Sequence, residues 1–239
     1  VVYYMKELSN LASSKLNQKI SSLSKQQWYA KEYLDNGAAI EVKISWNKKL
    51  TIDFDGTSAT VDGNLNATEA IVNGAVIYVL KLLIDHDIQL NEGLMRNVEL
   101  IIPQGTLLNP VFSDNPRECP AVVGGNTEVS QRLVDTLLKA FELAACSQGT
   151  MNNFLFGSDD FGYYETICGG TGAGNGFNGT DAVHQHMTNT QITDPEILEY
   201  TLAQDDTNRD EEWNLIFKSI SKIKEFSDKR SISFALVVY

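Results

Sequence analysis

The chain has 239 residues, enough for one large domain or two small ones, and 43% of them are hydrophobic, so a sizeable core is possible. Its net charge of −12 argues against unaided nucleic-acid binding, which needs a basic face, and against docking to anionic membranes. Its 3 cysteines are too few and too scattered for a disulfide framework, and we expect a reduced, cytoplasmic compartment.

The first quarter of the chain predicts a helix followed by a hairpin. Leucines and isoleucines at helical spacing predict an amphipathic helix over residues 5–27. Residues 39–46 alternate between apolar and polar side chains, and residues 50–54 repeat the pattern after a short polar turn. The two segments therefore predict a β-hairpin.

Two long helices are predicted in the middle of the chain. A capping signal at Asn66-Ala-Thr-Glu69 precedes residues 68–84, which are apolar on nearly every side and therefore belong in the core. Residues 98–103 predict a short strand. After a proline-containing loop, residues 128–143 carry an apolar stripe and predict the second long helix.

The second half is richer in polar residues. Short strands are expected near residues 153–156 and 162–167. A helix is expected to begin at Asp194-Pro-Glu196, and a further helix and a strand are expected in residues 204–239, after an acidic linker. We expect one α+β domain in which mixed or antiparallel sheet segments are packed by the two long core helices.

A series of short polar motifs spans the chain from about Tyr29 to Glu199. They are Asp53–Ser58, Gly63–Ala67, Leu90–Gly93, Pro103–Pro110, Val122–Asn126, Ser130–Arg132, Ser147–Asn153, Tyr163–Thr166, Gly169–Gly174, His186–Thr190 and Asp194–Glu199. In order and spacing this series resembles the hydantoinase B/5-oxoprolinase family. Residues 192–199 look closest to the oxoprolinase branch.

The resemblance implies ATP-dependent attack on a cyclic amide such as 5-oxoproline or hydantoin, or on a ketone as in the acetone carboxylases. In that family a hydantoinase A-like subunit or domain handles ATP, and the B-like half completes the site and carries a metal. ATP, Mg and a divalent metal are therefore implied for the complete assembly and none for this chain alone. We also expect a homo- or hetero-oligomer.

The chain departs from the family pattern at both ends. The family's metal-binding stretch lies upstream of the region that matches Tyr29, and here residues 1–28 form a predicted helix without histidine. The glycine- and arginine-rich segment of the family is replaced by residues 204–239, whereas residues 29–203 form the family-like core. We expect a fragment, a split-gene subunit or a reduced paralogue. The chain is then either an enzyme component or a non-catalytic binding or scaffold module.

Two histidines are candidates for chemistry. On a strand, His184 and His186 would point to one face and could share a metal, but no third ligand is evident in the sequence. A ligand-facing or hydrogen-bonding role is therefore favoured over a metal site. The resemblance selects His186 as a catalytic candidate. Glu165, in a predicted strand flanked by aromatic residues, is the second one. Glu165 would be either a base with a raised pKa or the ion-pair partner of a nearby arginine such as Arg132.

The remaining candidates are neutral polar residues. Gln148, Asn152 and Asn153 would orient a polar substrate through their amides, whereas Ser147 lacks the surroundings of a nucleophile elbow.

The glycine-rich stretch fits neither a dinucleotide fingerprint nor a P-loop, so tight ATP binding by this chain alone is not expected. The stretch is either a tightly turning loop or an anion-binding nest. Within the second interpretation, Gly170 and Gly172 would contact substrate. Thr188 and Asn189 join them because the family motif continues there.

Overall fold

The structure is a computed structural model that describes residues 2–84, 88, 90–158 and 161–186. It divides into two compact units, the first made of Val1–Phe154 and Glu165–Asn189 and the second of Leu155–Tyr164 and Thr190–Tyr239. The predicted elements beyond residue 194 therefore lie outside the described residues. None of the described helices combines the length and the apolar character needed to cross a bilayer.

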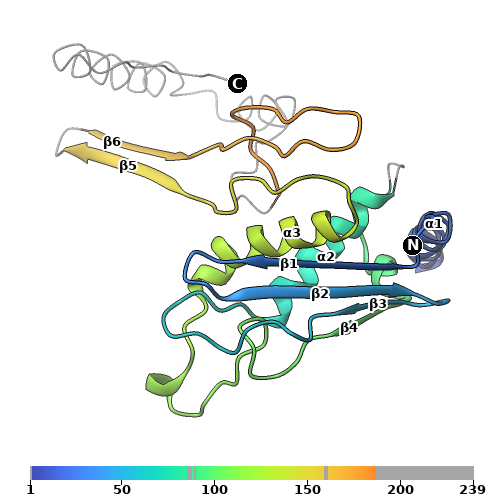
Figure 1. Ribbon diagram of the computed structural model, residues 1–239, viewed down its shortest axis with the longest axis horizontal. Coiled ribbons are helices and arrows are strands. Elements are labelled where there is room, and N and C mark those ends of the chain that lie inside the picture. Colours follow the sequence, from blue (N-terminus) through green and yellow to red (C-terminus); the bar gives the residue numbers. More distant parts are fainter. Residues whose placement is uncertain (1, 85–87, 89, 159–160, 187–239) are drawn as a thin grey trace. The chain divides into compact units, whose positions relative to one another are not determined.

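The first unit is built on a mixed sheet in the order β1-β2-β3-β4 (Figure 1). β1 (Gln27–Tyr33), β2 (Ala39–Trp46) and β3 (Leu50–Asp53) are antiparallel neighbours, and β4 (Val98–Ile101) runs parallel to β3. The predicted hairpin is confirmed as β2 and β3. β4 confirms the predicted strand in the middle of the chain.

The sequence pattern does not predict β1. In this strand only Trp28 and Ala30 are buried, so the alternation of buried and exposed residues is short. Alanine also has a weak preference for strands. β1 pairs with β2 along its full length, so tertiary pairing fixes the strand where local preference is weak.

Two helices cover the sheet and each other. α3 (Glu128–Ala140) contacts β1, β2 and α2 (Glu69–Leu83), and these elements share one core (Figure 1). Both long helices are confirmed, and so is the α+β class. The fully buried residues of the two helices include Val72, Val76, Leu133 and Leu137.

The first helix is shorter than predicted, and only the second half of its expected apolar stripe faces the core. α1 (Val2–Ser21) buries Ala12, Leu16 and Ile20, one residue per turn. Leu8 and Leu11, which belong to the expected apolar stripe, are each 46% exposed. Packing against the short 3-10 helix η1 (Glu92–Met95) selects this face.

η1 approaches α1 closely because it contains Gly93. A Cβ atom on Gly93 would lie 2.1 Å from the backbone oxygen of Ser9. Arg96, directly after η1, donates from Nη2 to Ser9 Oγ at 2.7 Å. Gly93, from the family-like motif at residues 90–93, therefore lets η1 pack against α1, and Arg96 ties the two helices together.

The expected helix cap is formed differently. Thr68 is the N-cap residue of α2 but makes no side-chain cap hydrogen bond. Asn66 is fully buried instead, accepts from Val61 N–H at 2.9 Å and donates to the carbonyl oxygens of Val61 and Ala121 at 3.0 Å. The motif thus ties together the loops that precede α2 and α3.

The two short strands predicted after α3 are confirmed, and they pair as a second hairpin. β5 (Asn153–Ser158) and β6 (Phe161–Thr166) form a two-stranded sheet. At its tip, which belongs to the second unit, Phe156 packs against Phe161 and Tyr163 with ring centroids 5.9 and 4.9 Å apart. These aromatic contacts hold the strand pair together.

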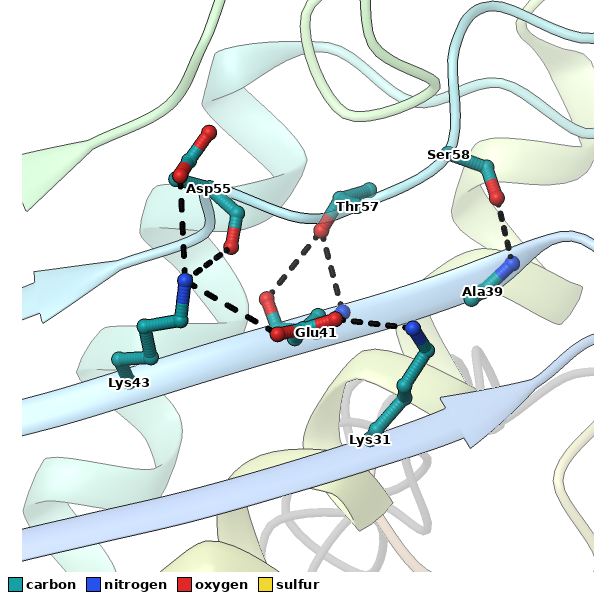
Figure 2. Close-up of polar contacts among 7 residues, drawn as sticks. All are labelled: Lys31, Ala39, Glu41, Lys43, Asp55, Thr57 and Ser58. Carbon is teal, nitrogen blue, oxygen red and sulfur yellow. Dashed lines mark hydrogen bonds and ion pairs between the residues drawn. The ribbon is translucent and has the colours of Figure 1, made fainter.

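The motif at residues 53–58 locks the end of β3 onto β2 (Figure 2). Thr57 Oγ1 accepts from Glu41 N–H at 3.1 Å, and Ser58 Oγ accepts from Ala39 N–H at 2.9 Å. Lys31 donates to Glu41 Oε2 at 2.9 Å, and this hydrogen bond is the main reason why the pKa of Glu41 is lowered. The fold thus accounts for Thr57 and Ser58 of this motif.

Gly56 offers a test of this lock. Its φ is +102°, and an added Cβ would lie 2.6 Å from Cδ of Glu41. We expect Gly56→Ala to lower the free energy of unfolding by about 2 kcal/mol. Alanine is strained at this positive φ, and its Cβ would in addition displace the Glu41 carboxylate. The matched control is Gly37→Ala, where φ is +84° and nothing lies within 4 Å, with an expected loss of about 1 kcal/mol. Equal losses in urea unfolding would show that the Glu41 contact is unimportant.

Candidate functional site

A polar stripe runs along α3, the helix that otherwise forms the core. Glu128, Gln131, Arg132 and Asp135 follow one another at helical spacing, and Gln131 and Asp135 are fully buried. Buried polar groups need partners, and here the partners come from two loops of the same unit. The stripe thereby holds these loops against the helix.

Asp135 anchors the loop that follows α3. Its Oδ1 accepts from Ser147 N–H at 3.0 Å, and its Oδ2 accepts from Ser147 Oγ at 3.3 Å. Burial raises the pKa of Asp135, whereas the two bonds from Ser147 and the charge of Arg132 oppose that rise. Both oxygens of Asp135 therefore hold Ser147 against α3.

His186 meets Asp135 from the other loop. Its Nε2 lies 3.6 Å from Asp135 Oδ1, and its Nδ1 lies 3.3 Å from the hydroxyl oxygen of Tyr78 on α2. Burial lowers the pKa of His186 to about 4, so the imidazole is neutral at neutral pH. The tautomer that suits both neighbours has its proton on Nε2, facing Asp135, and accepts from Tyr78 at Nδ1.

A pocket of about 310 Å³ opens beside this network. Its lining comes from the turn after β1, from the loop before α2, from the first turns of α3 and from the loop after α3. The lining residues are Leu34, Asp35, Leu65, Glu128, Arg132, Gln148, Gly149, Thr150 and Asn152. The pocket thus carries one basic side chain, two acidic ones and several neutral polar groups.

Gly149 brings the arginine into the pocket wall. Its φ is +72°, and a Cβ atom there would lie 2.5 Å from Nη2 and 2.8 Å from Cζ of Arg132. Only glycine lets the guanidinium lie this close to the loop backbone. Nε of Arg132 is buried and has no hydrogen-bond partner among the described residues.

The amide candidates divide between the pocket and the hairpin. Gln148 and Asn152 line the pocket, and Gln148 Nε2 donates to the carbonyl oxygen of Thr150. Asn153 lies outside the pocket lining, where its Oδ1 accepts from Thr166 Oγ1 at 2.8 Å. Glu165 is exposed on β6 and is not part of the lining.

The glycine candidates lie in tightly packed backbone. A Cβ atom on Gly172 would lie 2.0 Å from the carbonyl oxygen of Ala145, and one on Gly170 would lie 2.5 Å from that of Thr180. Thr171 N–H donates to Thr180 at 2.8 Å. Close packing accounts for these glycines. Thr188 and Asn189 lie outside the described residues.

His184 is paired with a cysteine. Its Nε2 lies 3.4 Å from Cys168 Sγ, and its Nδ1 is buried without a hydrogen-bond partner in the described part of the chain. The described residues contain no cluster of three or more His, Cys, Asp or Glu side chains that could hold a metal.

Sequence reasoning did not single out Asp135, Glu128 or Tyr78, and it considered Arg132 only as a partner for Glu165. The signal that could have found the α3 residues is the spacing of Glu128, Gln131, Arg132 and Asp135 inside an apolar helix. Tyr78 gave no such signal, because one aromatic residue on an apolar helix is ordinary core composition.

Comparison with protein families gives a match to the hydantoinase B/oxoprolinase model over residues 1–203. The match includes the first helix, ahead of the region where sequence motifs carried the resemblance. The recognised family is confirmed.

The chain is similar to several 5-oxoprolinases. It is 51% identical over 171 residues to 5-oxoprolinase 1 of Arabidopsis thaliana and 47% identical over 171 residues to 5-oxoprolinase of Dictyostelium discoideum. Each alignment covers 70% of this chain and 13% of the relative. The chain thus spans a small part of the length of these proteins.

Two solved structures share the fold. An ATP-dependent caprolactamase from Pseudomonas jessenii superposes with a TM-score of 0.58 at 19% identity, covering 82% of this chain and 37% of that one. A nucleotide-free acetone carboxylase superposes with a TM-score of 0.56 at 16% identity, covering 79% and 29%.

Removing the Asp135 carboxylate should loosen the loop after α3. We expect Asp135→Ala to lower the free energy of unfolding by roughly 3 kcal/mol, because both Ser147 donors lose their acceptor. Asp135→Asn keeps one oxygen acceptor and should lose roughly 1 kcal/mol. Asp114→Asn, at an exposed position, is the control for urea unfolding. Losses in Asp135→Ala no larger than in the control would contradict the anchoring role.

The neutral His186 makes stability depend on pH. Between pH 6.5 and about 4 the unfolded chain binds a proton at this residue and the folded chain does not. Stability should therefore fall as the pH drops through this window, by up to roughly 3 kcal/mol at its lower end. We expect the His186→Gln variant to lack this pH-dependent loss of stability. Asp135 is present in both proteins, so its titration does not distinguish them. Parallel pH profiles of unfolding free energy for the original protein and the variant would contradict the prediction.

Proposed function

The chain belongs to the hydantoinase B/oxoprolinase family, and we propose that it forms the hydantoinase B-type part of an ATP-dependent cyclic-amide hydrolase of the 5-oxoprolinase type. The observation that carries this proposal is the 51% identity to 5-oxoprolinase 1 over 171 residues. An ATP-dependent lactam-opening enzyme of the same fold, the caprolactamase, supports the reaction class.

The remaining machinery comes from a partner in this proposal. The chain covers 13% of 5-oxoprolinase 1, so a hydantoinase A-like subunit or domain would supply ATP and Mg chemistry, and the divalent metal belongs to the complete assembly. The enzyme would act in the cytoplasm as an oligomer.

Within this chain, His186 is the proposed proton-transferring residue. Burial lowers its pKa to about 4, so the resting imidazole is neutral and a weak base. It would take up a proton at Nδ1, in place of the Tyr78 hydroxyl, while the Asp135 carboxylate 3.6 Å from Nε2 stabilises the imidazolium that forms. Glu165 remains a proposed second acid–base group. It lies at an exposed position on β6.

The proposed substrate contacts divide into two groups. Gln148 and Asn152 would orient the cyclic amide from the pocket wall, since both line it. The other proposed contacts are Asn153, Gly170, Gly172, Thr188 and Asn189.

The test is an ATP-dependent ring-opening assay with 5-oxoproline and with hydantoin, run with and without a hydantoinase A-like partner. We expect activity only with the partner. His186→Asn should lower kcat by about 100-fold, because proton transfer loses its acceptor. Glu165→Gln is assayed beside it, and Glu92→Gln, which changes an exposed carboxylate on η1, is the control with unchanged kcat.

Thermal unfolding of each variant separates a loss of chemistry from a loss of folding. A folded chain that associates with its partner and opens neither ring would favour the alternative function, a non-catalytic binding or scaffold module.

A further inference from the structure

We propose that the pocket beside α3 selects cyclic amides that carry a carboxylate, with Arg132 as the residue that binds this carboxylate. The reaction that follows binding is that of the proposed function, and on this point the inference rests on it. The preference of the pocket for a carboxylate is independent of that reaction. Three properties of the described residues carry it.

The first property is an arginine with an unsatisfied donor. The buried Nε of Arg132 has no hydrogen-bond acceptor among the described residues, and the charge of the guanidinium acts on Asp135 nearby. A buried, unsatisfied donor is costly, so a ligand that supplies oxygen acceptors gains this free energy on binding. A carboxylate matches the planar fork of a guanidinium with two parallel bonds.

The second property is the rigid placement of that arginine. Gly149 lies directly against the guanidinium, and the neighbouring Ser147 is held by Asp135 through two hydrogen bonds. The loop that presents Gly149 is therefore fixed to the same helix that carries Arg132. A preorganised arginine loses less entropy when it binds a carboxylate.

The third property is the opposite charge on the other lining groups. Glu128, one helical turn before Arg132, accepts from Thr150 Oγ1, and Asp35 lies in the turn after β1. A lactam with a carboxylate presents an anionic group to Arg132 and an N–H donor to these acceptors. Its ring-opened product carries an ammonium group in place of the N–H, which the two acidic side chains also favour.

The pocket suits a small molecule better than a nucleotide. Its volume of about 310 Å³ is at the low end of the range for small-molecule sites. A triphosphate would meet two carboxylates and a single arginine. The charge pattern therefore selects a small ligand with one anionic group.

Calorimetric titration of the chain with 5-oxoproline and with 2-pyrrolidinone, the same ring without the carboxylate, tests the inference directly. We expect 5-oxoproline to bind at least about tenfold more tightly. Arg132→Gln should abolish this preference and Arg132→Lys should retain part of it. Arg117→Gln, at an exposed arginine, should leave it unchanged.

A second variant acts on the arginine without replacing it. Gly149→Ala should displace the guanidinium and reduce the preference, whereas Gly63→Ala, with φ +90° and nothing within 4 Å, should not. Thermal unfolding confirms that each variant is folded.

Equal affinity for the two ligands, binding of neither, or a preference that survives Arg132→Gln would each overturn the inference. Because no ATP or partner is needed, these outcomes are independent of the ring-opening assay. A carboxylate preference in a chain without ring-opening activity would uphold the pocket and reject the proposed reaction.

Discussion

The buried carboxylate of Asp135 is the constraint on which the rest of the site depends. A charge in the core is tolerated only with partners, and Asp135 finds them in the backbone N–H and hydroxyl of Ser147 and in the imidazole of His186. Because α3 packs against α2, β1 and β2, the loops that carry Ser147 and His186 are attached to an element of the core. The site is thus fixed to secondary structure although most of its residues lie on loops.

The glycines of the family motifs also hold loops and helices together, by allowing backbones and side chains to approach closely. Gly93 brings η1 against α1, Gly149 admits the Arg132 guanidinium, and Gly172 lets two loop backbones meet. In each case a Cβ atom would overlap a neighbouring atom, so the motif encodes a close approach and not flexibility. A glycine-rich segment that looks like a ligand loop in sequence is therefore also explained by packing between loops.

Periodicity predicted the elements whose burial follows their own residues. The two long helices and the hairpin of β2 and β3 each carry enough apolar side chains to specify their faces. β1 and the buried face of α1 were not predictable in this way, because pairing with β2 and packing against η1 decide them. The same limit applies to the site. Gln148 and Asn152 could be named from a motif, but their neighbour Arg132 enters the pocket through a contact with Gly149 that only the fold creates.

The proposed pocket and the proposed proton chemistry are coupled through one turn of α3. Arg132 and Asp135 are neighbours on the stripe, and the charge of Arg132 counteracts the rise in the pKa of Asp135 that burial causes. A substrate carboxylate bound to Arg132 would neutralise that charge, so the pKa of Asp135 would rise further. A proton near Asp135 and His186 is then held more firmly when substrate is present than when it is absent. Substrate recognition would in this way prepare the acid–base group, with no need for a movement of the helix.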